Sequence, residues 1–567
     1  MHGRLAGEEP PAAVRAGSNG RVEPGSDSGG GELFDVIVIG SGFGGAMAAY
    51  PLVRAGLRVL MIERGDWVPR GSEHCDAEGV GFLTPFYSTE TPYTLRTGAR
   101  RDTAGAFHCV GGQSVFYGAA ALRYRERDFE PDAEIVGDSA ARWPYRYADL
   151  ERHYGRAEAL LGVRTSAAGG EGGDPTEPPR SAPYEAASAP ELSDASRSVE
   201  RAARELGLSP FRLPLAVDPT ALARGECTCE RDGSGACTGR TRLDVASRVM
   251  PELLRLGLRL ATNTVAVRLV TEGRRVAAVR CVDRTSGRTV HYRARQFVLA
   301  AGTLASPHLL LASELDRLNP AGDAVIGRYL IRHRNAMVFG LFPRPLNAGG
   351  HIHKQIGIHD YYFGHPSVRY PKGKLGGIQQ VGVPSMGLAR SAVESALRSA
   401  AARRTLSAML ELSVPYISGL LILAEDQPRP ENRVTIDRTA PDRYGMPRLT
   451  VHHRYTERDI AAARALTRVA KRVLRRAGAL VLYTHAIETF SHALGTVRMG
   501  VDPHTSALDG WSRFRGVENL CVTDGSCMPT SAGVNPSLTI AANALRAGEC
   551  LALRMAAERE AGHAAAD

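Results

Sequence analysis

Short apolar runs bounded by glycines or polar residues dominate the hydrophobic pattern of this chain. The first run, Phe34 to Ile39, is rich in β-branched residues and predicts a buried parallel strand. It leads directly into the turn Gly40-Ser-Gly-Phe-Gly-Gly45, after which the apolar residues are spaced as in a helix. A second strand is expected over Arg58 to Ile62, with Glu63 at its end. The pattern therefore predicts a β-α-β unit with a glycine-rich turn at its first junction.

This turn has the spacing that binds the pyrophosphate of a dinucleotide. Gly40 permits the tight turn, Gly42 lets backbone amides approach the phosphates, and Gly45 allows the helix to pack closely on the strand. The helix N-terminus adds positive potential. A carboxylate at the end of the second strand can accept hydrogen bonds from the adenosine ribose. We therefore predict a dinucleotide site with contacts at Gly40, Gly42, Phe43, Gly45, Glu63 and Arg64.

The rest of the chain has weaker patterns. The runs Arg259 to Leu269 and Val276 to Val282 predict two hairpin strands, and Arg295 to Gly302 predicts a sheet strand that ends in small residues. Gly, Pro, Ser and Ala dominate between about 160 and 200, which indicates a surface excursion or linker. From about 331 to 485 the chain has Gly- and His-containing loops, alternating stretches and one strongly apolar run. We interpret this region as most of a second domain that covers the cofactor.

Composition and charge exclude several classes of protein. A chain of 567 residues exceeds one ordinary core, and its apolar fraction of 43% is typical of globular proteins. No segment is long and apolar enough to span a bilayer. Residues 1–31 lack the apolar region of a secretory signal and predict a disordered tail. The net charge of +10 comes mainly from arginines scattered among 60 acidic residues, so no nucleic-acid partner is expected.

Nine cysteines without an export signal indicate reduced thiols in a cytoplasmic protein. Three of them, Cys227, Cys229 and Cys237, form a cluster. A structural zinc site usually has four ligands in paired spacing, so we predict no metal. A local disulfide and buried or loop thiols both remain open for this cluster.

Three distant segments together resemble the glucose–methanol–choline (GMC) oxidoreductase family. The first is the N-terminal turn with Ile62-Glu-Arg-Gly65, and the second is Val110-Gly-Gly-Gln-Ser-Val-Phe-Tyr-Gly118. The third and most specific runs from Ser491-His-Ala-Leu-Gly-Thr-Val-Arg-Met-Gly500 to Asn535. The resemblance covers about residues 34 to 555.

This resemblance implies an α/β fold in which a Rossmann-type FAD-binding domain is interleaved with an α+β substrate-binding domain that covers the flavin. We expect a disordered N-terminal tail, a C-terminal tail, three FAD-domain parts, a substrate-domain excursion with a linker, and the substrate-binding domain itself. The tails are residues 1–31 and 557–567, and the three FAD-domain parts are 32–145, 225–330 and 486–556. The excursion with its linker is 146–224, and the substrate-binding domain is 331–485.

The resemblance also implies the positions of functional residues. The family's flavin-facing histidine falls on His492, and its partner, which is His or Asn in the family, falls on Asn535. Asp524 matches the acid near the ribityl and pyrophosphate groups of the flavin cofactor. Further cofactor contacts are expected at Gly111, Gly112, Ser114, Tyr117, Gly118, Ala266, Ala301, Gly525 and Pro536.

Such a pair suits the oxidation of an alcohol, because hydride loss from the carbon is easy only when the hydroxyl proton is leaving. A neutral imidazole at His492 can take that proton near neutral pH. Asn535 can hold the developing alkoxide with its amide hydrogens. The resemblance implies that the flavin accepts the hydride at N5, and that O2 or another oxidant then takes the electrons.

Two departures from the family pattern concern the flavin loop. Many members have Asn where this chain has Tyr117, which is more like the pyranose oxidase branch. The position of the histidine that binds flavin covalently in that branch is Phe116, while His108 lies just before the loop. We therefore expect non-covalent FAD. Four other histidines carry no such motif and are interpreted as structural or surface groups: His333, His452, His453 and His485.

Two other classes remain as alternatives. The first turn alone does not separate a nicotinamide-dependent dehydrogenase from a flavoenzyme, but the segment around Asp524 favours FAD. A non-catalytic flavin-binding protein would have no need of both His492 and Asn535.

For the substrate, the abundance of Arg, Ala and Gly indicates a high-GC genome, and the flavin loop resembles the pyranose oxidase branch. Both favour similarity to actinobacterial members that oxidise a sugar hydroxymethyl group in aminoglycoside antibiotic biosynthesis, to the aldehyde or on to the carboxylate. The alternative is a sterol or fatty alcohol, because the segment Cys227 to Arg240 is similar to a Cys-rich stretch of those members. A polycationic substrate needs carboxylates nearby. The candidates, each of which could instead form a structural ion pair, are Glu411, Glu425, Asp426 and Glu488.

Overall fold

The computed structural model describes most of the chain, namely residues 32–68, 87–97, 100–166, 173–187, 192–223, 241–346, 354–381, 409, 412–487, 490 and 492–564. Several predicted features lie outside these residues: the N-terminal tail, Cys227, Cys229, Cys237, Glu411 and Glu488.

The largest sheet within the described residues has seven strands. Its parallel strands are β1 (Leu33–Ile39), β2 (Val59–Ile62), β9 (Arg259–Ala261), β12 (Thr289–Leu299) and β20 (Leu520–Val522). The hairpin β10 (Thr264–Glu272) and β11 (Arg275–Asp283) continues this sheet in antiparallel order from β12. Helix α1 (Phe43–Arg54) connects the neighbouring parallel strands β1 and β2. The predicted β-α-β unit is therefore confirmed.

One predicted strand is wrong in its extent. The run Arg259 to Leu269 forms two strands, because β9 ends at Ala261 and β10 begins at Thr264. Asn263 between them has a φ of +52°, in the left-handed region that Asn tolerates better than most residues. The resulting turn sends β9 and β10 to opposite ends of the strand order.

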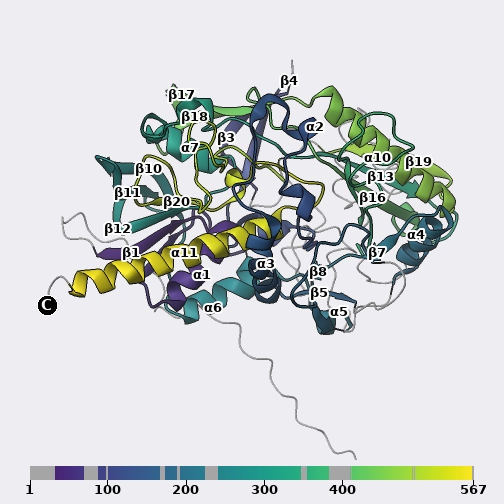
Figure 1. The fold of residues 1–567 in the computed structure, drawn as a ribbon, viewed down its shortest axis with the longest axis horizontal. Helices are drawn as coiled ribbons and strands as arrows, with labels where there is room; N and C mark the ends of the chain where they lie inside the picture. Colours follow the sequence, from purple (N-terminus) through teal and green to yellow (C-terminus); the bar gives the residue numbers. More distant parts are fainter. Residues whose placement is uncertain are drawn as a thin grey trace, which may run out of the picture.

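A second, six-stranded sheet has the order β19 (Val481–Ala486), β13 (Arg334–Leu341), β16 (Ile417–Ala424), β15 (Gly376–Val381), β14 (Ile356–Ile358) and β7 (Pro210–Arg212). The strongly apolar run predicted in this region is β16, which is buried in the middle of the sheet. Helices α10 (Glu457–Arg476) and α4 (Asp194–Glu205) pack beside this sheet. Figure 1 shows the two large sheets on opposite sides of the molecule, with the long helix α11 (Ser537–Ala564) beside α1.

Smaller sheets and further helices surround the two large sheets in the described part of the chain. A four-stranded sheet contains β17 (Arg433–Pro441), β18 (Pro447–His453), β3 (Tyr87–Thr97) and β4 (Arg100–Phe107), and a three-stranded sheet contains β6 (Glu185–Ala187), β5 (Val163–Ser166) and β8 (Leu215–Ala216). Among the described residues, the other α-helices are α2 (Ala133–Val136), α3 (Tyr147–Leu161), α5 (Pro219–Ala223), α6 (Met250–Arg255) and α7 (Ala305–Ala312). Over the described ranges, no helix has the length and apolarity needed to cross a membrane.

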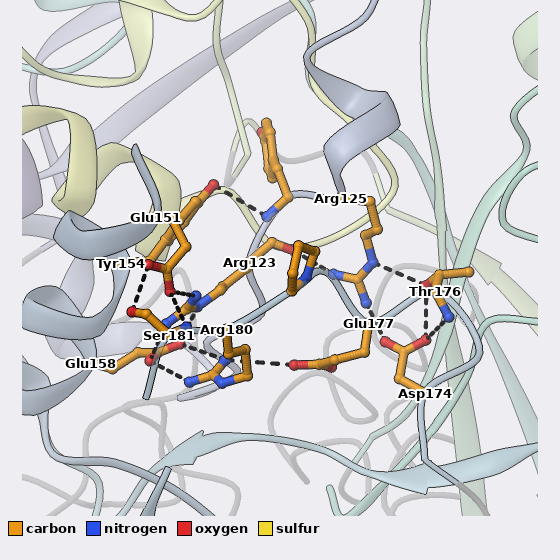
Figure 2. Close-up of polar contacts among 12 residues, drawn as sticks. Arg123, Arg125, Glu151, Tyr154, Glu158, Asp174, Thr176, Glu177, Arg180 and Ser181 are labelled. Atoms are coloured by element: carbon orange, nitrogen blue, oxygen red, sulfur yellow. Dashed lines mark hydrogen bonds and ion pairs between the residues drawn. The ribbon is translucent and has the colours of Figure 1, made fainter. Parts of the chain in front are cut away.

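A buried network of arginines and carboxylates fixes the segment around Asp174 (Figure 2). The side chain of Arg123 is 1% exposed and donates to both carboxylate oxygens of Glu158 at 2.9 Å. Arg125 pairs with Asp174, whose Oδ2 lies 2.8 Å from Nδ1 of His359. Each buried guanidinium thus faces a carboxylate, as burial of a charge requires. The region predicted as an excursion therefore contributes Asp174 to the interior, while the predicted domain boundaries themselves stay predictions.

Candidate active site

The glycine-rich turn combines two packed glycines with one that faces open space. Gly40 has a φ of +101°, and a Cβ there would overlap the carbonyl of Ala300. A Cβ on Gly45 would overlap the carbonyl oxygen of Gly40. At Gly42, by contrast, the nearest heavy atom to an added Cβ is the oxygen of Gly111, at 4.0 Å. The turn thus forms a cradle that a side chain on Gly42 would fill, at the N-terminus of α1.

A hydrogen-bond chain connects this turn to the predicted flavin loop. Glu63, 7% exposed, accepts from the Ser41 hydroxyl at 2.5 Å and from the Gly65 amide at 2.8 Å. The Gly111 amide in turn donates to the Ser41 oxygen at 3.0 Å. Burial raises the pKa of Glu63, although these hydrogen bonds act in the opposite direction. Sequence reasoning missed Ser41, whose place inside the glycine turn was the available signal.

The flavin loop itself is held by its own residues and by the segment near 243–245. Gly111 and Gly112 have φ of +86° and +54°, and a short 3-10 helix follows over Gly112–Phe116. Ser114 donates to the Gly111 carbonyl at 2.6 Å and accepts from the Val245 amide at 3.2 Å. The hydroxyl of Tyr117 donates to the Leu243 carbonyl at 2.6 Å. Burial raises the pKa of this phenol, so Tyr117 is a neutral donor that holds the loop.

The ends of the loop contact residues from other elements. The ring of Tyr117 lies edge-on to Phe43, the first residue of α1, with centroids 5.4 Å apart. A Cβ on Gly118 would lie 2.5 Å from Nζ of Lys354, so this ammonium group lies over the loop.

Asp524 lies on the other side of the turn. Its carboxylate accepts from the Gly302 amide at 3.0 Å and from the Ser526 amide at 2.8 Å, and it also pairs with the hydroxyl of Ser306. A Cβ on Gly44 would come within 2.8 Å of the Asp524 Cα, which shows how closely the two segments approach. The predicted neighbours Ala301 and Gly525 occupy the same region, next to Gly302 and in the 3-10 helix after Asp524.

Three predicted cofactor residues lie farther along these elements. Arg64 places its guanidinium 5.4 Å from the ring of Tyr444. Ala266 lies in β10, an outer strand of the large sheet, directly before a β-bulge. The Pro536 carbonyl accepts the Ile540 amide at 2.9 Å, at the start of α11.

The two predicted catalytic residues meet, although 43 positions separate them in the chain. Nδ2 of Asn535 lies 3.4 Å from Nε2 of His492. Oδ1 of Asn535 accepts from Nε2 of Gln379 in β15 at 2.8 Å. Gln379 is fully buried and was not identified from the sequence, where it carries no motif. Burial holds the pKa of His492 well below its usual range, and the nearby charges of His333 and Lys354 act in the same direction. The imidazole is therefore neutral near pH 7.

His333, which the sequence pattern placed among the structural histidines, is a direct neighbour of His492. Their Nδ1 atoms lie 3.2 Å apart, and the ring planes are nearly perpendicular at 85°. His333 comes just before β13 and is 1% exposed. No local signal in the sequence brings this residue to His492, which is 159 positions away.

The suggestion that Glu425 and Asp426 face a cationic substrate is wrong. Both side chains are buried, at 0% and 1% exposed. Glu425 accepts from the Ala532 amide at 3.0 Å, and Asp426 accepts from the His333 amide at 3.0 Å and the Ser531 hydroxyl at 2.8 Å. Burial raises the pKa of Glu425 to about 7. Backbone amides and a hydroxyl donate to these carboxylates, and Nζ of Lys374 lies 4.0 Å from Oε2 of Glu425, so both side chains are held inside the protein and anchor the segment that carries Asn535.

Two observations concern the cofactor and metals. The open cradle at Gly42, with Glu63 at the end of β2 and the N-terminus of α1 behind it, could hold the pyrophosphate and ribose of FAD. Within the described ranges no group of three or more His, Cys, Asp or Glu could hold a metal ion.

His108 lies before the flavin loop, where burial, together with the charges of Arg64 and Arg284, lowers its pKa to about 2. Whether FAD is attached covalently stays a prediction.

Comparisons with known proteins agree with this architecture. Two models described as GMC oxidoreductase match residues 35–335 and 428–544. The chain is 32% identical to 6'''-hydroxyparomomycin C oxidase of Streptomyces lividus, over 97% of this chain and 96% of that protein. It is 33% identical to paromamine 6'-oxidase of Streptomyces fradiae, over 92% of this chain and 91% of that protein.

Among solved structures, pyridoxine 4-oxidase from Mesorbium loti has a similar fold. The two chains superpose with a TM-score of 0.61 at 19% identity, over 91% of this chain and 98% of the other. A second neighbour, an FAD-dependent oxidoreductase from Chaetomium thermophilum, superposes with a TM-score of 0.57 at 15% identity, over 92% of this chain and 99% of the other. With a family model that covers more than half of the sequence, a Rossmann-type fold and a cradle that fits the cofactor, this chain belongs to the GMC oxidoreductase family and is an FAD-dependent enzyme.

Proposed function

We propose that this enzyme oxidises a primary alcohol on a sugar or aminoglycoside precursor to the aldehyde, with His492 as the general base. The observation that carries this proposal is the 3.4 Å approach of His492 Nε2 to Asn535 Nδ2. One atom there accepts a proton and the other donates a hydrogen bond, which are the two groups that an alcohol oxygen needs as it loses its proton.

Asn535 and His492 have different roles at the substrate hydroxyl group. Asn535 donates to the substrate oxygen, and His492 takes the hydroxyl proton on Nε2 as the O–H bond breaks. FAD, when bound, supplies the acceptor for the hydride that leaves the alcohol carbon. Because the pKa of His492 is held low, its imidazole is available as a base across the neutral range. Loss of the proton and the hydride converts the C–O single bond to the carbonyl.

For the cofactor we propose non-covalent FAD held by the residues predicted from the sequence. The pyrophosphate would lie against Gly42 and the α1 N-terminus, and the ribose against Glu63. Asp524 and the loop from Gly111 to Gly118 would contact the flavin half. The adenine contact at Ala266 rests on the family resemblance alone.

The substrate class is supported by the similarity to two aminoglycoside oxidases, at 32% and 33% identity over nearly the whole chain. Lys354 limits how a cationic substrate can be oriented, because the charge of Lys354 acts on His492 and the Lys354 ammonium group lies over Gly118. The amino groups of an aminoglycoside would therefore point away from Lys354, with only the 6'-hydroxymethyl end at the base. Glu425 and Asp426 are not available to bind those amines. A sterol or long-chain alcohol is the alternative substrate, and it has no such charge requirement.

The experiment is anaerobic bleaching of the flavin by paromamine, by a sterol and by a long-chain alcohol. Paromamine is expected to bleach the flavin. Bleaching by sterol or long-chain alcohol but not by paromamine would overturn the substrate assignment. The products, aldehyde or carboxylate, are separated by mass spectrometry of the same reactions, and the oxidase rate is measured with O2. The cytoplasmic location also stays a prediction.

A further inference from the structure

His333 contacts His492 on the side away from Asn535. Nδ1 of His492 faces Nδ1 of His333 at 3.2 Å, while Nε2 of His492 faces the Asn535 amide at 3.4 Å. A neutral imidazole carries one proton, so one of these two nitrogens donates and the other accepts. The identity of the protonated nitrogen decides whether His492 presents a base or a donor to the substrate.

The backbone determines this choice. Nε2 of His333 lies 2.9 Å from the carbonyl oxygen of Ser531 and 3.0 Å from that of Ala532. Carbonyl oxygens only accept, so Nε2 of His333 carries its proton. Burial lowers the pKa of His333, so the ring is neutral and its Nδ1 is bare. This bare nitrogen can only accept, and the group it faces is Nδ1 of His492.

We propose that His333 is a positioning residue that holds the proton of His492 on Nδ1 and thereby leaves Nε2 bare. The inference deepens the proposed function and rests on the role given there to His492. It assigns a direction to the whole chain of hydrogen bonds, from Gln379 through Asn535 and His492 to His333.

The far end of this chain is consistent with that direction. Gln379 donates to Oδ1 of Asn535 at 2.8 Å, which leaves Nδ2 of Asn535 as the group that faces His492. Nδ2 is a donor, and the atom that receives from it, Nε2 of His492, must be bare. Both ends of the chain therefore place the lone pair of His492 at Nε2.

The fold holds His333 rigidly in this position. Asp426 accepts from the amides of Arg332 at 2.8 Å and His333 at 3.0 Å, and also from the hydroxyl of Ser531 at 2.8 Å. The Asp426 carboxylate thus fixes both His333 and the segment whose carbonyl oxygens accept the hydrogen bond from Nε2 of His333. Tyr455 donates to the His333 carbonyl at 2.8 Å.

The arrangement also serves the reaction. When His492 takes the substrate proton on Nε2 it becomes an imidazolium, and its Nδ1–H keeps the acceptor on His333. Protonation of His333 would turn that acceptor into a donor aimed at another N–H. The charged groups that act on the pair are Asp426 and Asp128 at His333 and Lys354 at His492. Both histidine pKa values are lowered, so the chain is intact at neutral pH and is lost only below about pH 6.5.

Two amide substitutions separate the two ring nitrogens of His333. His333→Asn can place an oxygen where Nδ1 lies and so keeps the acceptor for His492. His333→Gln can place an amide nitrogen where Nε2 lies, which keeps the donor to the carbonyls but removes the acceptor. By rapid mixing with paromamine under anaerobic conditions, or with the fastest alcohol of the substrate panel, His333→Gln is expected to reduce its flavin about tenfold more slowly. His333→Asn is expected to stay within about threefold, and the substrate dissociation constant is expected to change in neither variant.

Thermal unfolding and FAD content provide the structural readout, since a purely structural role would affect both variants alike. Equal rates in the two variants, or a faster reduction in His333→Gln, would overturn the proposal. The wild-type pH profile is a measurement that requires no variant: the reduction rate should fall only on the acid side, and a rate that rises as His333 is protonated would also overturn it. If His492→Ala reduces its flavin as fast as wild type, the proposed function itself fails. If that variant is slow while the Asn and Gln variants are equal, only the inference about His333 fails.

Discussion

Substitution of Gly42 tests the cofactor site without disturbing the fold. Gly42 has φ −70° and ψ −167°, an extended conformation that valine adopts readily. The nearest heavy atom to a Cβ at this position is 4.0 Å away, so the protein accommodates the added carbon. The same carbon would occupy the cradle expected to hold the FAD pyrophosphate. Gly42→Val is therefore predicted to fold normally and to bind FAD poorly.

The size of this effect follows from the cost of excess volume in a packed site. Inserting methyl groups into a well-packed region typically costs about 1–3 kcal/mol. Applied to the complex alone, this cost raises the FAD dissociation constant by about 5- to 150-fold. Because FAD stabilises only the folded state, the variant also loses about 1.4 kcal/mol of FAD-dependent stabilisation for each tenfold loss of affinity.

Three measurements on the purified protein check this prediction: flavin absorbance per polypeptide, titration of the FAD-free protein with FAD, and thermal unfolding with and without FAD. Gly173→Val is the matched control, because Gly173 is exposed and no atom lies within 4 Å of an added Cβ. Without FAD, Gly42→Val should unfold like FAD-free wild type, and a given concentration of FAD should stabilise it less than wild type. A fully yellow Gly42→Val protein with the wild-type dissociation constant would refute the assignment of the cofactor to this turn.

The remaining predictions concern His492, Asn535, one other buried histidine and one buried ion pair. His492→Ala should retain FAD but reduce it about 10²–10⁴-fold more slowly in rapid mixing, with a smaller deficit at high pH; a rate within threefold of wild type would remove His492 from the mechanism. Asn535→Ala should be the milder lesion in the same assay, because it removes one hydrogen bond rather than the proton acceptor, and a larger loss than in His492→Ala would contradict this. Stability should fall as the pH drops from about 6.5 toward 4, because burial lowers the pKa of His153 to about 4 and the unfolded chain then binds more protons than the folded one; flat urea midpoints over that range would argue against it. Asp174→Asn should cost about 3–5 kcal/mol in urea unfolding, since it leaves the buried guanidinium of Arg125 without its carboxylate, and a cost below about 1 kcal/mol would show that other groups compensate.

The sequence alone was sufficient for features made by consecutive residues. The strand from Phe34, the turn and helix α1 follow one another without interruption, so apolar spacing and glycine positions predicted them directly. The GMC motifs predicted catalytic roles for His492 and Asn535 for the same reason, because each lies in a short segment with a specific pattern, and the structure places the two side chains 3.4 Å apart. The break at Asn263 was not predicted, since the residues on either side continue the same strand-like pattern.

Only the tertiary structure decided how distant groups combine. Nothing in the local pattern distinguishes His333 from the other histidines, and its proposed role arises because the chain enters β13 beside the segment of Ser531 and Ala532. In the sequence Glu425 and Asp426 are acids that could bind a cationic substrate, yet in the structure both are buried and accept hydrogen bonds from that segment. Periodicity reports which face of an element is buried, whereas the partner of a buried polar group is fixed by contacts across the chain. The protonated nitrogen of His492 is such a case, because carbonyls some 40 residues away and a histidine 159 residues away determine it together.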